Sequence, residues 1–166
     1  MVTHSARSGS RREARRDGTF LAWMLISAGR YDEAYGHCEK LPPDFWSKSG
    51  CLARARFWQG RIGEAIQILA TAKDRGAFPD IPILPYVYVR AGRREEAEKL
   101  AAELSSLQQA AIFAGLGDKD RTIEALDRSA VLGPFRIGVA LTFPEFALLR
   151  GDPRVKALRK KVGLPE

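Results

Sequence analysis

The stretch "AGRREEAEKL", Ala91–Leu100, decides how the chain is read, because its first seven residues recur along the sequence. It places a glycine at a turn, follows it with arginines and acids, and continues into an apolar helical run. Related stretches are "AGRYDEA" (28–34), "QGRIGEA" (59–65) and the degenerate "LGDKDRT" (116–122). The turn glycines are Gly29, Gly60, Gly92 and Gly117, with spacings of 31, 32 and 25 residues. Recurrence at a near-constant period is typical of a repeat architecture.

Each copy has the pattern of a helical hairpin. An apolar run precedes the glycine, as in "TFLAWMLIS" and "ILPYVYVR", and an amphipathic run with helical spacing follows it. Glycine permits the left-handed conformation that ends the first helix. The alanine five residues after the glycine is small enough for close helix packing. No strand-like alternation of useful length is present, so we expect an all-α fold. Prolines at 82 and 85 predict that the first helix of the third hairpin is kinked or starts late.

These motif residues resemble the tetratricopeptide repeat (TPR), a helix–turn–helix of about 34 residues. The resemblance extends to a small residue seven positions before most turn glycines, at Ala22, Ala53 and Ala110, with Pro85 in the third copy. It implies a right-handed α-α superhelix, a TPR-like solenoid, with about four hairpins over residues 18–133. Three copies match well, and the fourth is shortened.

The C-terminal stretch "TFPEFALLRGDPRVKALRKKVGLPE" resembles the tail that closes TPR arrays in bacterial regulators and cyclases. Asp152 is expected to be an N-cap, Pro153 the first helical residue and Gly163 the stop. We therefore expect a capping segment over 134–166 with a C-terminal helix, whose apolar residues would cover the exposed face of the last repeat. Such arrays often follow an effector domain, and the sequence leaves open whether this chain stands alone or is a fragment.

The net charge of +7 is concentrated at the two ends of the 166-residue chain. Residues 1–17 form a basic arm, expected to be partly disordered, and residues 150–166 are also rich in Lys and Arg. The body is neutral overall, which weakens a nucleic-acid interpretation of it. The basic ends are either solvated or contact nucleic acid or an anionic surface. No apolar run approaches the ~20 residues that span a bilayer.

The sequence contains no catalytic signature, so we expect a protein that is not an enzyme and has no cofactor and no metal. His37 is interpreted as an ordinary helix residue. Asp118 and Asp120 flank a turn, which favours helix capping over a catalytic carboxylate pair. Cys38 and Cys51 are not in a CxxC arrangement, and we interpret them as small apolar residues, reduced in a cytoplasmic protein.

A binding function fits the pattern better. The resemblance implies a concave groove lined by first-helix residues six and two positions before each turn glycine, and aromatic and arginine residues there favour binding. The same residues could instead belong to the core or to an oligomer contact. We expect a protein–protein interaction scaffold that binds a protein or peptide with acidic or aromatic side chains, with no small-molecule substrate and no membrane partner. The alternative is a nucleic-acid-associated regulator that uses its basic termini. The candidate groove residues are Trp23, Ser27, Arg54, Trp58, Tyr86 and Arg90.

The absence of asparagine rules out one kind of TPR site. Chaperone-binding TPR proteins hold a C-terminal carboxylate with a clamp that uses asparagines, and this chain contains none. We therefore do not expect a clamp of that kind.

Overall fold

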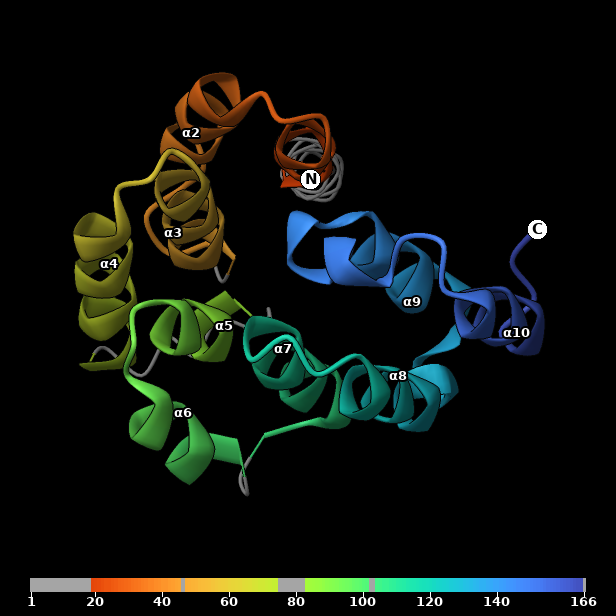
Figure 1. The fold of residues 1–166 in the computed structure, drawn as a ribbon. Helices are drawn as coiled ribbons and strands as arrows, with labels where there is room; N and C mark the ends of the chain where they lie inside the picture. The colour runs from red at the N-terminus through yellow and green to blue at the C-terminus, as the bar shows by residue number, and fades with distance from the viewer. Residues whose placement is uncertain (1–18, 46, 75–82, 102–103, 166) are drawn as a thin grey trace, which may run out of the picture. The chain divides into compact units, whose positions relative to one another are not determined.

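The computed structural model describes residues 19–45, 47–74, 83–101 and 104–165, with Lys73, Asp74 and Leu100 described by backbone alone. Every regular element in these ranges is a helix, as expected from the sequence (Figure 1). The chain divides into two compact units, Met1–Asp80 and Ile81–Glu166. None of the helices in the described ranges has the length and apolar character needed to cross a membrane. The expected N-terminal arm lies outside the described residues.

The first unit contains two helical hairpins. The first hairpin joins helical residues 19–27 to α2 (Tyr31–Glu39), and the second joins α3 (Lys48–Trp58) to α4 (Ile62–Asp74). Helix α3 packs against both α2 and α4. The helices share a core in which Leu25 and Ile26 of the first helix meet Ala34 of α2 and Ala55 of α3. The two first helices therefore pack against each other, as stacked hairpins require.

The second unit continues the pattern with α5 (Ile83–Arg90), α6 (Arg94–Ala101), α7 (Ser106–Gly115) and α8 (Lys119–Arg128). Helix α5 contacts both its hairpin partner α6 and the next first helix α7, which packs in turn against α8. The close approach of α5 and α7 depends on Gly115, where a Cβ atom would lie 3.1 Å from Val89. The described part of α5 begins at Ile83 with Pro85 in its first turn, whereas Pro82 lies outside the described residues, so the expected kink or late start of this helix stays a prediction.

All four hairpins turn in the same way. The turn glycines have φ between 77° and 81°, a region that residues with a Cβ atom rarely adopt. In each turn the glycine N–H donates to the carbonyl three residues earlier, and the following N–H donates to the carbonyl five residues earlier. This pair of bonds is the Schellman motif. The predicted role of the glycines is confirmed.

The charged part of the repeat forms a side-chain pair at the start of each second helix. In the first hairpin, Arg30 donates two hydrogen bonds of 2.6 Å to Glu33. Arg61 and Arg93 pair in the same way with the glutamates three residues after them. In the fourth hairpin the charges are exchanged, because Asp118 accepts from Arg121 at 2.6 Å. The recurring Arg–x–x–Glu pattern is thus a local ion pair.

The residue five positions after each glycine is buried, as predicted. Ala34, Ala65 and Ala97 are completely buried, and so is Thr122, which replaces alanine in the fourth copy. The Thr122 hydroxyl donates to the carbonyl of Asp118, which satisfies its polarity within the helix. A threonine is therefore tolerated at a position that otherwise requires a small apolar side chain.

The C-terminal segment is more elaborate than the single helix expected. Residues 129–165 form η1 (Ser129–Leu132), α9 (Gly133–Thr142), η2 (Pro144–Leu149) and α10 (Pro153–Lys161). The predicted boundaries of α10 are confirmed, because Asp152 accepts from the Arg154 N–H and Gly163 has a φ of 78°. Element η2 packs against α7 and α9, and α10 packs against α8 and α9. The cap is therefore a small helical layer.

Candidate functional site

A groove of about 490 Å³ lies in the first unit, between α2 and α4. The connection between α2 and α3 and the start of α3 form its remaining wall. Apolar and aromatic side chains alternate with polar ones along the lining, which is a composition typical of ligand sites. The lining residues are Tyr35, Pro43, Asp44, Phe45, Ser49, Glu64, Gln67, Ile68, Thr71 and Ala72.

Two lining residues of the groove, Tyr35 and Glu64, hold the side chain of Arg56 in a fixed position. The Arg56 guanidinium lies 3.6 Å from the centre of the Tyr35 ring, and its Nε atom lies 3.2 Å from Glu64. Its Nη1 atom donates to Gln59 at 3.0 Å. An aromatic face and a carboxylate together hold a guanidinium well. Among the described lining residues, Asp44 and Glu64 carry the charges, and Glu64 is already paired with Arg56 and Arg61. Asp44 is therefore the carboxylate on the rim that can attract a cationic ligand.

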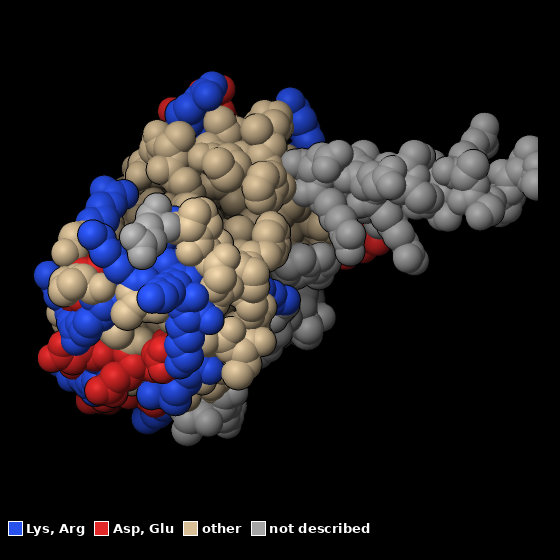
Figure 2. All heavy atoms as spheres, turned by 90° about the vertical axis from the view of Figure 1, so that its right-hand side faces the viewer, with Lys and Arg blue, Asp and Glu red and all other residues tan. Residues whose placement is uncertain are grey.

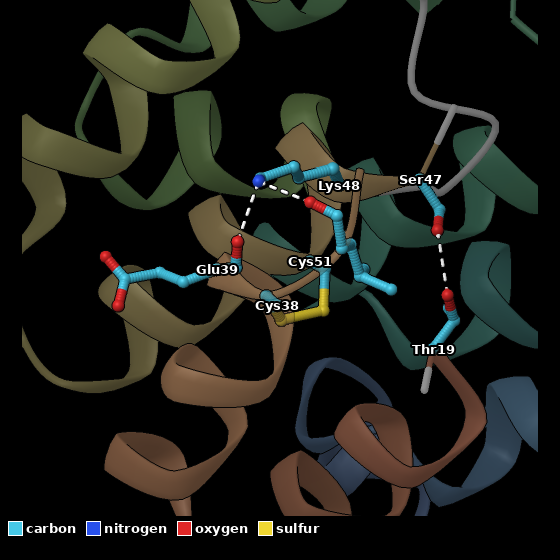
Figure 3. Close-up of a disulfide and its surroundings, with 7 residues drawn as sticks. Thr19, Cys38, Glu39, Ser47, Lys48 and Cys51 are labelled. Carbon is cyan, nitrogen blue, oxygen red and sulfur yellow. Dashed lines mark hydrogen bonds between the residues drawn. A yellow bond between two sulfur atoms is a disulfide. The ribbon is translucent and has the colours of Figure 1, made fainter. Parts of the chain in front are cut away.

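The wall of the groove is braced by a disulfide between Cys38 of α2 and Cys51 of α3 (Figure 3). Their Cα atoms are 5.8 Å apart, within the range of protein disulfides. The prediction of two reduced cysteines is therefore wrong. Both side chains are fully buried, as predicted, but they face each other across the two helices. The cytoplasmic location expected from reduced cysteines loses that support, because disulfides persist mainly in oxidising compartments.

Lys48 adds a second brace to the same connection. Its ammonium group donates to the main-chain carbonyls of Glu39 at 2.8 Å and of Leu41 at 2.5 Å (Figure 3). The Glu39 carbonyl belongs to the last turn of α2, where helix geometry leaves acceptors unsatisfied, and the Leu41 carbonyl lies two residues further along the chain. Ser47, one residue earlier, is completely buried and lies 3.3 Å from the Thr19 hydroxyl. The chain between the cysteines is thus held at both ends.

The candidate groove residues of the first unit have mixed environments. Arg54 is completely buried, whereas Trp23, Ser27 and Trp58 are half-buried. Trp58 packs against the core, with its ring 6.3 Å from Tyr31 in a stacked arrangement. The Ser27 hydroxyl donates to the Trp23 carbonyl at 3.0 Å. Packing within the unit explains the positions of most of these four side chains. Their role in binding stays a prediction.

The two candidates of the second unit differ from each other. Arg90 is exposed at the end of α5. Tyr86 is buried against α7, where it approaches Gly115. Burial raises the pKa of the Tyr86 phenol, and the nearby charge of Glu145 raises it further. Arg90 is therefore the candidate in this unit whose side chain a partner can reach.

The acidic and histidine candidates have structural roles. Asp118 caps α8, as predicted, and accepts a hydrogen bond from the Arg121 N–H. Asp120 does not cap but pairs with Arg154 at 2.6 Å. His37 is a half-buried residue of α2. Within the described ranges, no three His, Cys, Asp or Glu residues are grouped so that they could hold a metal ion.

Two of the five cations of α10 form ion pairs, and a third binds a main-chain carbonyl. Arg154 binds Asp152 and Asp120, and Lys161 binds Asp127 at 2.7 Å. Arg159 donates to the carbonyl of Pro165 and so closes the C-terminal turn. Lys156 and Lys160 are exposed and have no ion pair within the described part of the chain. The basic C-terminus is thus partly neutralised, which weakens its attraction for phosphates.

The N-cap of α10 makes stability depend on pH. Hydrogen bonds from the Arg154 side chain and then from its main-chain N–H lower the pKa of Asp152 from 3.8 to about 2. The unfolded chain therefore binds a proton more readily, so this contribution is complete above pH 3.8 and is lost as the pH falls towards 2. We expect Asp152→Asn, which keeps an N-cap side chain, to lower the melting temperature at pH 6 but not near pH 2. A difference that is equal at both pH values would contradict the role of the charge.

The groove was not predicted from the sequence, because the expected binding surface was assigned to the first helices of the hairpins. The groove instead lies between second helices, α2 and α4, and much of its wall is irregular chain. The signal in the sequence was the rigid, partly apolar connection "LPPDF", residues 41–45. Comparison of the whole chain with models of protein families, with curated proteins and with solved structures gives no match. The resemblance to tetratricopeptide repeats therefore rests on the motif residues themselves.

Proposed function

We propose that the chain is a non-enzymatic protein-interaction module, built from TPR-like hairpins in a right-handed superhelix, that binds a peptide segment of a partner. The shared turn geometry and the packing of first helices against each other within each unit support the repeat assignment. Repeat proteins of this kind present extended surfaces to their ligands. A nucleic-acid-associated regulator is the second candidate, favoured by the exposed Lys156 and Lys160 and weakened by the ion pairs of α10.

The groove of the first unit is the observation that carries this proposal. It is large enough for a few side chains of a peptide, and its wall is fixed by the disulfide and by Lys48. A wall that is already ordered lowers the entropic cost of binding. Phe45, Ile68 and Ala72 offer apolar contact, and Asp44 attracts a positive charge. The peptide that fits has an apolar residue beside a lysine or arginine.

Filling the groove tests this function. Gln67 is exposed on α4 and lines the groove, so Gln67→Trp would occupy the space without disturbing the core. Peptides selected on the wild-type chain from a displayed random library should bind this variant at least about tenfold more weakly, as measured by calorimetry. They should also be enriched in Lys or Arg beside an apolar residue. The matched control is Ala157→Trp, which adds the same ring at an exposed position of α10.

A different result is expected if peptides bind the concave surface that the sequence predicted. Selected peptides that bind Gln67→Trp normally but lose affinity for Arg90→Ala would move the site from the groove to that surface. A library that yields no peptide above background on the folded wild-type chain would argue against peptide binding altogether.

A further inference from the structure

An apolar turn with arginines on both sides stands out on the second unit. The stretch "RSAVLGPFR", Arg128–Arg136, connects α8 to α9 through η1. Val131 is 90% exposed, Phe135 65% and Leu132 43%. Large apolar side chains are seldom so exposed next to one another unless they meet a partner. We call these three residues the apolar tip.

The tip is held in place by the residues around it. The Ser129 side chain is buried, and its hydroxyl donates to the Ala125 carbonyl at 2.8 Å. Gly133 has a φ of 80°, and Pro134 starts α9. Ile137 is completely buried on the inner face of α9. Because the tip lies between anchored residues, its exposure follows from the fold of the turn.

An exposed arginine stands on each side of the tip. Residues 128–144 contain two arginines, Arg128 and Arg136, and no acid, and both arginines are exposed. The pair between Lys161 and Asp127 brings the end of α10 to the end of α8, next to the start of this segment. Lys160 is therefore carried to the same end of the unit. On the face seen in Figure 2, Lys and Arg side chains gather together with Asp and Glu side chains.

We propose that the apolar tip docks on an anionic lipid surface, with Val131, Leu132 and Phe135 entering the boundary between headgroups and acyl chains. Arg128 and Arg136 would then lie at the level of the lipid phosphates, where each cation strengthens the binding. Apolar area and positive charge act together in this kind of binding. The proposal departs from the expectation of no membrane partner and involves attachment to the surface only.

The shape and charge of the tip favour lipid over a protein. A side chain that is 90% exposed, like Val131, projects from the surface and would need a matching pocket in a rigid partner, whereas a bilayer accommodates it. A second copy of the chain is disfavoured, because a two-fold contact at the tip would bring the arginines of both copies together. The net charge of +7 also opposes self-association.

Vesicle co-sedimentation of the full chain tests the proposal. The probe is vesicles of phosphatidylcholine that contain roughly 30% of the anionic lipid phosphatidylserine. Vesicles of pure phosphatidylcholine are the comparison. We expect binding to the anionic vesicles that weakens with salt. The double variant Val131→Ser with Phe135→Ser should lose at least about tenfold in affinity. Arg128→Gln and Arg136→Gln should each lose about fivefold, the equivalent of ~1 kcal/mol per cation.

The matched control is Leu21→Ser with Met24→Ser, which removes exposed apolar side chains from the first unit. It should bind the vesicles as the wild type does. The proposal is overturned if the wild type does not sediment with anionic vesicles at low salt, or if the tip variant and the control lose affinity equally. It is also overturned if the tip variant binds vesicles normally but converts a dimer to a monomer in light scattering, because the occupant is then a second copy.

Discussion

Replacing Phe146 by alanine is expected to lower the free energy of unfolding by about 3–5 kcal/mol. The Phe146 side chain is 2% exposed and belongs to η2, which packs against both α7 and α9. Removing the ring takes apolar contact away from an element that packs on two helices. It leaves a cavity that a short 3-10 element, which starts at Pro144 and is followed by Gly151, cannot close easily. The loss should therefore be near the upper part of the range for buried phenylalanines.

Chemical denaturation followed by circular dichroism measures this loss. The control is Phe135→Ala, which removes the same ring from a position that is 65% exposed and should cost less than about 1 kcal/mol. If both variants are destabilised to the same extent, Phe146 does not have the buried role that its environment indicates.

Loss of the disulfide should destabilise the chain by about 3 kcal/mol. The bridge spans a sequence separation of 13 residues, and opening a loop of about this length releases chain entropy in the unfolded state. For a protein of this size, that corresponds to a fall in melting temperature of roughly 6–12 °C. Cys38→Ala with Cys51→Ala should show this fall, because alanine leaves no thiol and adds no bulk.

Reduction of the wild-type chain provides an independent measurement. A dithiol reductant should lower the melting temperature of the wild type towards that of the double variant. It should leave the melting temperature of the double variant unchanged. Thiol labelling under denaturing conditions, with and without prior reduction, should find two reactive cysteines only after reduction. A wild-type chain that melts at the same temperature in both conditions, with its bridge intact beforehand, would show that the disulfide contributes little.

The hairpins could be predicted from the sequence because their turns depend on single residues with few substitutes. A positive φ requires glycine, so Gly29, Gly60, Gly92 and Gly117 marked the turns directly. The buried alanines followed from the same register. The capping of α10 by Asp152 was equally local, since an N-cap acts on the next few residues. Each of these features involves residues within one turn of chain.

The features that escaped prediction depend on contacts between elements. Nothing in the separation of Cys38 and Cys51 indicates that α2 and α3 bring their sulfur atoms together. The groove arises from the spacing of α2 and α4, which residue patterns do not specify. The apolar tip escaped prediction for a related reason, because the sequence around Val131 and Phe135 does not say whether another element covers them.

The exchanged pair of the fourth turn has a consequence for recognising further copies of this hairpin. Asp118 and Arg121 occupy the positions that Arg30 and Glu33 occupy in the first turn, and both arrangements start a helix from the same glycine geometry. What the first and fourth turns share at these two positions is a pair of opposite charges, and either order of the two residues provides it. A search that scores each position separately would reject the fourth copy, whereas one that scores the product of the two charges would retain it.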